Sequence, residues 1–346
     1  MARDVQVGRC MNRREKEQRT ARIFVLLLAV LLMVLGAAVY LLFFRVRDIS
    51  LDMGYDKNHP VLGTSALTLE NGMASSFAAD LCVSAGDVAL GDFEVPAQSA
   101  ALFDEAERQV VYAKGLHEKR YPASLTKIMT TLVALKYGNL DDVITVGEEC
   151  KDIEYGSSVC DIHVGDRFTL KQLLYGLMIN SGNDAAMTIA VHIGGSVEQF
   201  VEMMNREAAA IGAVDTHFAN PHGLQDEQHY TTAYDVYLMF HEALKYDVFK
   251  DIINRHTYYA EYTDAAGEEQ GIMWESTNHY FINEAVPPAD VLVSGGKTGT
   301  TDAAGACLCL YSMNKYGDPF ISIIMHAEDK DSLYEEMNDL LSKINK

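Results

Sequence analysis

The sequence lacks both the cysteine spacing of a metal site and, beyond its first 22 residues, any excess of positive charge. Six cysteines occur but no C-x-x-C pair, which argues against a zinc site; no metal and no organic cofactor is expected. The chain of 346 residues carries −21 and residues 1–22 carry +4, so the remainder carries −25. Such an acidic surface repels nucleic acid, and no nucleic-acid partner is expected.

Long hydrophobic runs are also scarce, and the only one is residues 23–44, which contain no charge. At about 1.5 Å per residue the run would span roughly 33 Å, against about 30 Å for a bilayer core. The small residues Gly36-Ala37-Ala38 lie inside the run, which favours an uncleaved anchor over a cleaved signal. Seven basic and three acidic residues precede it, so the N-terminus is expected in the cytoplasm.

These features predict four segments. They are a cytoplasmic basic segment (1–22), a transmembrane anchor (23–44), an extracytoplasmic stalk and lead-in segment (45–95), and a folded domain (96–346). Of the cysteines outside the membrane, Cys150 and Cys160 could form a bridge across a short loop or remain free buried thiols. Cys307 and Cys309 would share one face of a strand and are expected to be packing residues.

Strand patterns at both ends of the domain enclose a helical middle. Strands are expected at 99–103, 109–113, 291–298, 306–313 and 320–327, with turns at 104–108 and 314–318. Helices are expected at 124–137, after Thr169, from Asp184 to Gly194-Gly195, from a Ser196/Gln199 capping box to Gly212, from Thr231 or Thr232, and near the C-terminus. The pattern predicts an α+β fold, in which an antiparallel sheet flanked by helices carries an inserted, mostly helical lobe.

Three short motifs occur in order along this domain. Ser124-Leu125-Thr126-Lys127 fits S-x-x-K, Ser181-Gly182-Asn183 fits S-x-N, and Lys297-Thr298-Gly299 fits K-T-G. Each motif alone is weak, and S-x-x-K in particular is common by chance. Their combination is typical of class A β-lactamases and penicillin-binding proteins.

The chemistry of the first motif is that of an activated serine. Ser124 and Lys127 are three apart in a predicted helix, so their side chains share a face. A serine hydroxyl needs a base to take its proton, and Lys127 can serve only if its pKa falls from about 10.4 toward 7–8. A second ammonium nearby lowers that pKa, because like charges resist coexisting; Lys297 is the candidate.

The other motifs supply candidate partners for a substrate. Ser181 could relay a proton to a leaving group, and Asn183 could hydrogen-bond a substrate amide. Lys297 and Thr298 could bind a terminal carboxylate beside a strand edge that pairs with an extended peptide. Gly299 removes a side chain where that peptide must approach.

These residues resemble the low-molecular-mass penicillin-binding proteins of the D-alanyl-D-alanine carboxypeptidase family. The resemblance spans about residues 97–346 and includes 123–130, 181–186, the Asn220-Pro221-His222-Gly223-Leu224 segment and 296–300. It implies a β-lactamase/transpeptidase-like fold, and makes 96–346 a catalytic domain that removes the terminal D-alanine from peptidoglycan stem pentapeptides.

The same resemblance implies a mechanism and a location. The acyl-enzyme would form on Ser124 and be hydrolysed by water, and penicillins would acylate the same serine. The backbone N–H groups of Ser124 and Thr300 would form the oxyanion hole, where each donor is typically worth about 3–4 kcal/mol. The enzyme is expected at a bacterial cell membrane, as a single-pass protein with an extracytoplasmic catalytic domain.

The sequence departs from the family in two places. Many members carry a second, β-rich domain and a C-terminal amphipathic anchor, whereas this chain ends soon after its last predicted strand and its anchor is expected at the N-terminus. The family often has an arginine near the Asn278-His279 segment that helps to hold the substrate carboxylate. This sequence has His279 there.

The three motifs alone leave other functions open. A class A-like β-lactamase needs a positioned glutamate, and no clear E-x-x-L-N lies between Asn183 and Lys297. A D,D-endopeptidase would use the same site, and a catalytically silent wall-binding sensor would not need the intact motifs. A Ser–His hydrolase using His217 or His222 has no recognisable nucleophile elbow to support it.

Overall fold

The computed structural model describes residues 80–345. The predicted basic segment, the transmembrane anchor at 23–44 and residues 45–79 of the predicted stalk lie outside the described residues, so these assignments stay predictions. Within the described part, no helix is long and apolar enough to cross a membrane.

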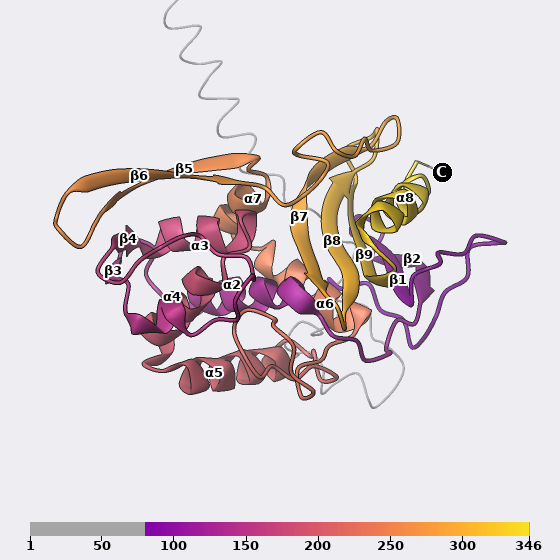
Figure 1. Ribbon diagram of the computed structural model, residues 1–346. Coiled ribbons are helices and arrows are strands. Elements are labelled where there is room, and N and C mark those ends of the chain that lie inside the picture. Colours follow the sequence, from indigo (N-terminus) through magenta and orange to yellow (C-terminus); the bar gives the residue numbers. More distant parts are fainter. Residues whose placement is uncertain (1–79, 346) are drawn as a thin grey trace, which may run out of the picture. The chain divides into compact units, whose positions relative to one another are not determined.

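A five-stranded antiparallel sheet takes its strands from both ends of the described chain (Figure 1). The strand order is β2-β1-β9-β8-β7. The bounds are β1 Ser99–Asp104, β2 Gln109–Lys114, β7 Leu292–Thr301, β8 Gly305–Met313 and β9 Pro319–Ala327. The predicted sheet is therefore confirmed. It leaves β7, which carries the K-T-G motif, at an edge with one side unpaired by any strand.

Each face of this sheet covers its own hydrophobic core, because successive side chains of a strand point to opposite faces. In β9, Phe320 and Ile324 pack with α8 (Lys330–Leu341), while Ile321 and Ile323 pack with the helical lobe. Cys307 and Cys309 of β8 are fully buried in the core that faces the helical lobe, where they are packing residues.

The helical lobe joins β2 to β7. It contains η1 Ala123–Leu125, α2 Thr126–Tyr137, α3 Leu170–Ile179, α4 Asn183–Gly194, α5 Val197–Ala210, α6 Ala233–Ala243 and α7 Asp247–Ile253. Thr169 and Gln172 form a reciprocal capping box at the start of α3, and Ser196 accepts the Gln199 N–H at the start of α5. The first nine residues of α2 are all buried, so the helix that follows Ser124 runs through the core of the lobe.

A second sheet, of order β3-β4-β5-β6, was not predicted. Its strands are β3 Val143–Thr145, β4 Arg167–Thr169, β5 Thr257–Thr263 and β6 Glu269–Glu275. The β5–β6 hairpin lies along α3 (Figure 1), where Tyr258 stacks on Tyr175 with ring centroids 3.9 Å apart. Polar residues interrupt the apolar pattern of β5 and β6, so aromatic packing on α3 fixes the hairpin more than sequence alternation does.

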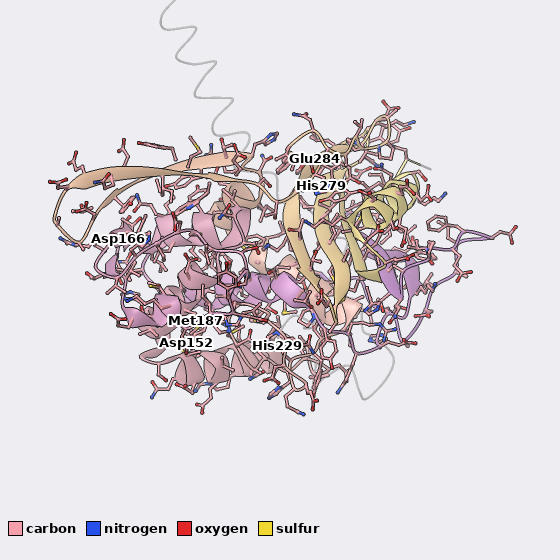
Figure 2. All side chains as sticks on the ribbon, in the orientation of Figure 1. Asp152, Asp166, Met187, His229, His279 and Glu284 are labelled. Atoms are coloured by element: carbon pink, nitrogen blue, oxygen red, sulfur yellow. The ribbon has the colours of Figure 1, made fainter. Side chains whose placement is uncertain are left out.

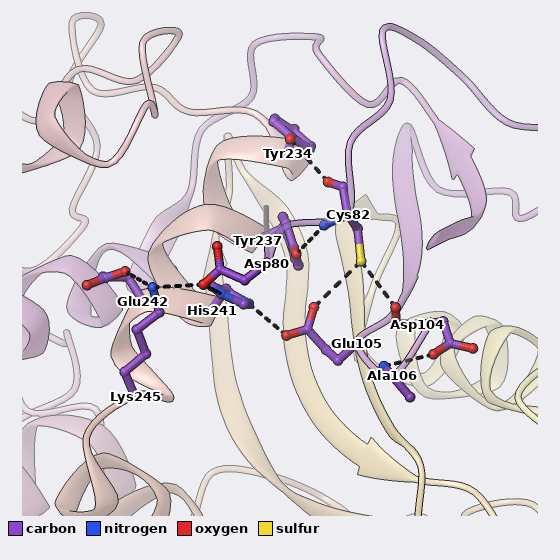
Figure 3. A network of polar contacts seen from close by, with 10 residues as sticks. All are labelled: Asp80, Cys82, Asp104, Glu105, Ala106, Tyr234, Tyr237, His241, Glu242 and Lys245. Carbon is purple, nitrogen blue, oxygen red and sulfur yellow. Dashed lines mark hydrogen bonds and ion pairs between the residues drawn. The ribbon is translucent and has the colours of Figure 1, made fainter. Parts of the chain in front are cut away.

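The end of the predicted lead-in segment is tied to α6 (Figure 3). The Cys82 N–H donates to Tyr237 Oη at 2.8 Å, and Tyr234 Oη donates to the Cys82 carbonyl at 3.1 Å. His241 Nδ1 lies 2.7 Å from Glu105 Oε2, which joins the same helix to the β1–β2 turn. Residues from about 80 onward therefore pack as part of the folded domain.

The described cysteines are all free and buried. Of the two alternatives left open for Cys150 and Cys160, the structure has the unbridged one. The Cys160 sulfur packs tightly against Gly176 and Gly182. A Cβ atom added at Gly176 would lie 2.6 Å from this sulfur, and one added at Gly182 would lie 2.2 Å from it. Both glycines are thus required by the packing of Cys160.

Candidate active site

The three motifs converge on one pocket of about 110 Å3 between β7, α8 and the helical lobe. Its walls include Ser124, Ser181, Thr298, Gly299 and Thr300, as the sequence predicts. Lys127, Asn183 and Lys297 lie behind this surface, each less than 4% exposed. The walls also contain residues that were not predicted as site residues from the sequence: Ser158, Thr277, Cys307, Lys330, Leu333 and Tyr334.

Ser124 is in η1, not in the α-helix that the sequence predicts, because the chain turns sharply before it. Ala123 has a φ of 46°, a left-handed conformation, and α2 begins only at Thr126. Gly299 of β7 passes so close to this turn that a Cβ there would lie 2.9 Å from the Ser124 nitrogen. The glycine was expected to admit substrate; in the structure it admits the serine turn itself, which brings the Ser124 N–H beside β7.

Lys127 makes three short contacts in the core of the site. Its Nζ lies 2.9 Å from Ser124 Oγ, 2.7 Å from Asn183 Oδ1 and 2.8 Å from the His222 carbonyl oxygen. The two carbonyl oxygens can only accept hydrogen bonds. A neutral amine would therefore give its two N–H groups to them and turn its lone pair toward the Ser124 hydroxyl.

The environment favours that neutral form. Complete burial, and secondarily the charge of Lys297, hold the pKa of Lys127 well below its usual range. Burial also lowers the pKa of Lys297 to about 7. Both effects follow from the cost of placing ammonium charges in a dry interior. The predicted depression of the Lys127 pKa thus has a structural basis, although burial rather than Lys297 is its main cause.

Lys297 connects the second and third motifs. Its Nζ donates to Ser181 Oγ at 3.0 Å and to the Thr298 carbonyl oxygen at 2.8 Å. Ser181 has a φ of 60°, so its backbone is strained into the left-handed region where the loop leaves α3. The arrangement forms a second serine–lysine pair, whose serine lines the same pocket as Ser124.

Asn183 is the first residue of α4, and the neighbouring Asp184 fixes where that helix begins. The carboxylate of Asp184 accepts the N–H groups of Cys160 at 2.8 Å and Ile162 at 3.2 Å. The Asn183 N–H donates to the Ser158 carbonyl at 2.9 Å. Asp184 is buried, which raises its pKa, while these backbone donors act in the opposite direction. This role could not be predicted from the sequence, because the partners lie more than twenty positions earlier.

The position expected to hold a carboxylate-binding arginine has a histidine with partners of its own. His279 Nε2 lies 3.3 Å from Glu284 Oε2, and its ring stacks on Tyr334 of α8 with centroids 4.5 Å apart. Figure 2 shows His279 and Glu284 together near one end of β7. Lys330, at the start of α8, also lies in the walls of the pocket and is exposed.

The histidines do not form a Ser–His pair in the described structure. His222 contacts Lys127 through its carbonyl oxygen, and its Nδ1 accepts the Leu224 N–H at 3.1 Å. His217 Nδ1 lies 2.5 Å from the Gln228 carbonyl. Burial lowers the pKa of His222 to about 3. The base within reach of Ser124 is Lys127, so the Ser–His alternative is wrong.

A serine and a lysine one turn apart, backed by a second buried lysine on an edge strand, define the site of a serine–lysine acyl-transfer enzyme. The sequence pattern of D-alanyl-D-alanine carboxypeptidases, peptidase family S11, matches residues 86–329. The chain belongs to this family, as the motifs predict.

Individual relatives agree with this assignment. The chain is 36% identical over 217 residues to the D-alanyl-D-alanine carboxypeptidase DacF of Bacillus subtilis. The matched region is 61% of this chain and 53% of that protein. The chain is 32% identical over 257 residues to DacD of Escherichia coli, covering 72% and 63%. The chain thus spans between about half and two thirds of the length of these relatives.

The fold has solved counterparts. The crystal structure of the Streptomyces K15 DD-transpeptidase superposes with a TM-score of 0.68 at 25% sequence identity, covering 73% of this chain and 98% of that one. The α+β architecture with antiparallel sheets and packed helices is therefore that of a D,D-peptidase.

Proposed function

We propose that the protein is a serine D,D-carboxypeptidase, which removes the terminal D-alanine from peptidoglycan stem peptides that end in D-Ala-D-Ala and is acylated by penicillins. The observation that carries the proposal is the position of Lys127, which is buried, depressed in pKa and 2.9 Å from Ser124 Oγ. Two fixed carbonyl acceptors leave its lone pair for the serine proton.

In the proposed reaction, Lys127 takes the Ser124 proton while Oγ attacks the carbonyl carbon of the penultimate residue. The N–H groups of Ser124 and Thr300 stabilise the oxyanion, an arrangement supported by the close approach of Gly299 to the Ser124 nitrogen. Ser181, bonded to Lys297, passes a proton to the leaving amine. D-alanine departs, and water then hydrolyses the ester on Ser124.

The substrate would lie as an extra strand along the free edge of β7. Asn183 would hydrogen-bond its amide, and Thr298 and Lys297 would face its terminal carboxylate. Because Lys297 already bonds Ser181 and Thr298, we add Lys330 as a further cation for that carboxylate. His279 already contacts Glu284 and would contribute less.

The location is part of the same proposal. Residues 23–44 would anchor the protein in a bacterial cell membrane as a single span, with residues 1–22 in the cytoplasm and the catalytic domain outside. The uncharged length of the run and the basic residues before it support this assignment.

Mass spectrometry of the full-length protein tests the activity. After incubation with penicillin, the expected result is a covalent adduct on the peptide that contains Ser124, absent from a Ser124→Ala variant. A peptide ending in D-Ala-D-Ala should lose one D-alanine. Absence of any adduct would refute the serine chemistry and favour a silent wall-binding protein. Rapid release of hydrolysed penicillin would favour a β-lactamase, and an adduct without D-alanine release would favour an endopeptidase.

Replacing Lys330 with glutamine tests the carboxylate contact. We expect KM to rise about three- to tenfold for a peptide with a free terminal carboxylate, since a hydrogen-bonded ion pair at an exposed position is worth about 1 kcal/mol. The kcat should change little, because the charge does not contact the reacting atoms. Steady-state kinetics on the free and C-terminally amidated peptides separate the effects. An equal rise in KM for both peptides would contradict the assignment.

A further inference from the structure

The residue before Ser124 has a backbone conformation that an alanine rarely adopts. Ala123 has a φ of 46°, where its Cβ crowds the neighbouring backbone. Such a conformation persists only when surrounding contacts hold it. The turn directs the chain into η1 and sets the orientation of the following Ser124, so the contacts around Ala123 bear directly on the proposed nucleophile.

Two contacts fix the carbonyl oxygen of Ala123. The hydroxyl of Thr126 donates a hydrogen bond to it at 2.8 Å. Gly223, with a φ of 92°, packs against the same oxygen so tightly that a Cβ on it would lie 1.9 Å away. Gly223 therefore closes one side of the carbonyl by contact, and Thr126 holds it by a directed hydrogen bond.

His229 in turn orients the Thr126 hydroxyl. Its Nε2 lies 2.7 Å from Thr126 Oγ1, and its Nδ1 accepts the Ala219 N–H at 3.1 Å. A ring nitrogen that accepts carries no proton, so the hydrogen-bond network assigns the proton to Nε2. Nε2 then donates to Thr126 Oγ1, which leaves the hydroxyl proton for Ala123. His229, Thr126 and Ala123 thus form a chain of hydrogen bonds in which each residue donates to the next.

The location of His229 suits this role. It lies in the loop before α6 and is not among the residues that line the pocket, and it is 2% exposed. Burial lowers its pKa to about 4, so the ring is neutral at physiological pH and has the one donor and one acceptor that the chain requires.

We propose that His229 is a positioning residue for acylation, which acts through Thr126 to hold the Ala123 carbonyl and thereby the direction of the Ser124 hydroxyl and N–H. This inference rests on the proposed role of Ser124 as the nucleophile. Neither His229 nor Thr126 lines the pocket, so both would affect the rate of the chemical step rather than the binding of substrate.

The test uses two threonines of the same helix. Thr126→Val removes the hydroxyl that bonds Ala123, whereas Thr131→Val removes an equally buried hydroxyl that has no hydrogen-bond partner in the described structure. Penicillin acylation is followed over a range of concentrations, which separates the acylation rate constant from the non-covalent dissociation constant. Because a misplacement of about 1 Å costs roughly a hundredfold, we expect Thr126→Val to lower the rate constant about ten- to a hundredfold. Thr131→Val should leave it within about twofold.

Variants of His229 test the chain itself. His229→Leu removes donor and acceptor and should lower the acylation rate constant about as much as Thr126→Val. His229→Gln keeps both functions and should recover most of it. Since both residues act through one carbonyl, the double variant Thr126→Val/His229→Leu should be little slower than the worse single variant.

Several results would overturn the inference. One is a Thr126→Val rate constant equal to that of Thr131→Val. Another is a multiplicative loss in the double variant, and a third is a fall in rate that follows melting temperature across all the variants. Failure of the proposed function is a different result, because the wild-type protein would then form no adduct on Ser124 at all.

Discussion

Lys127→Ala is expected to lower the rate of Ser124 acylation by about a hundredfold to ten-thousandfold, the usual contribution of a general base. The amine is the only base bonded to Ser124 Oγ in the described structure, at 2.9 Å. Its complete burial lowers its pKa and makes it available to accept a proton. Stopped-flow measurement of penicillin acylation, with melting temperature measured in parallel, checks the prediction.

Two further variants identify the cause of the loss. Lys136→Ala changes another lysine of α2, which pairs with the buried Glu207 and not with Ser124, and should leave acylation unchanged. Lys127→Arg keeps a cation that does not lose its proton near neutral pH. If Lys127 acts as a base, the arginine variant should be as slow as the alanine variant. An active arginine variant would mean that the residue serves as a fixed charge instead.

The sequence predicts the parts of this site that are local. The three-residue spacing of Ser124 and Lys127 places both on one face of a helical turn, and the order of the three motifs identifies their partners. The strands with clear apolar runs, such as β8 and β9, were predicted nearly to the residue. Local spacing and apolar alternation suffice for these features because the residues that decide them are close neighbours in the sequence.

Contacts between distant segments could not be predicted in this way. The left-handed turn at Ala123 has no local signal, since glycine is the usual residue in that conformation, and the residue packed against it is Gly223. The start of α4 depends on Asp184 binding backbone groups of the 160–162 loop. The β5–β6 hairpin depends on aromatic stacking against α3. Each of these features is decided by tertiary packing.

The same burial that prepares the site for chemistry should make it costly to fold. Lys297 is 1% exposed, and burial lowers its pKa from 10.5 to about 7. At about 1.4 kcal/mol per pH unit, keeping it in the native state costs up to about 5 kcal/mol at neutral pH. The unfolded chain binds one more proton than the native state between pH 7 and 10.5, so native stability rises with pH across that window.

Lys297→Met should therefore stabilise the protein at pH 7 while lowering its activity. Loss of the hydrogen bonds to Ser181 and the Thr298 carbonyl offsets about 1–3 kcal/mol, which leaves a net gain of up to about 2–4 kcal/mol and several degrees in melting temperature. The advantage over wild type should shrink as pH rises toward 10.5. Lys330→Met, which makes the same change of charge at an exposed position, should show neither the gain in stability nor its dependence on pH. A Lys297→Met variant that is less stable than wild type at pH 7, with no dependence of the difference on pH, would mean that the hydrogen bonds of Lys297 outweigh its desolvation.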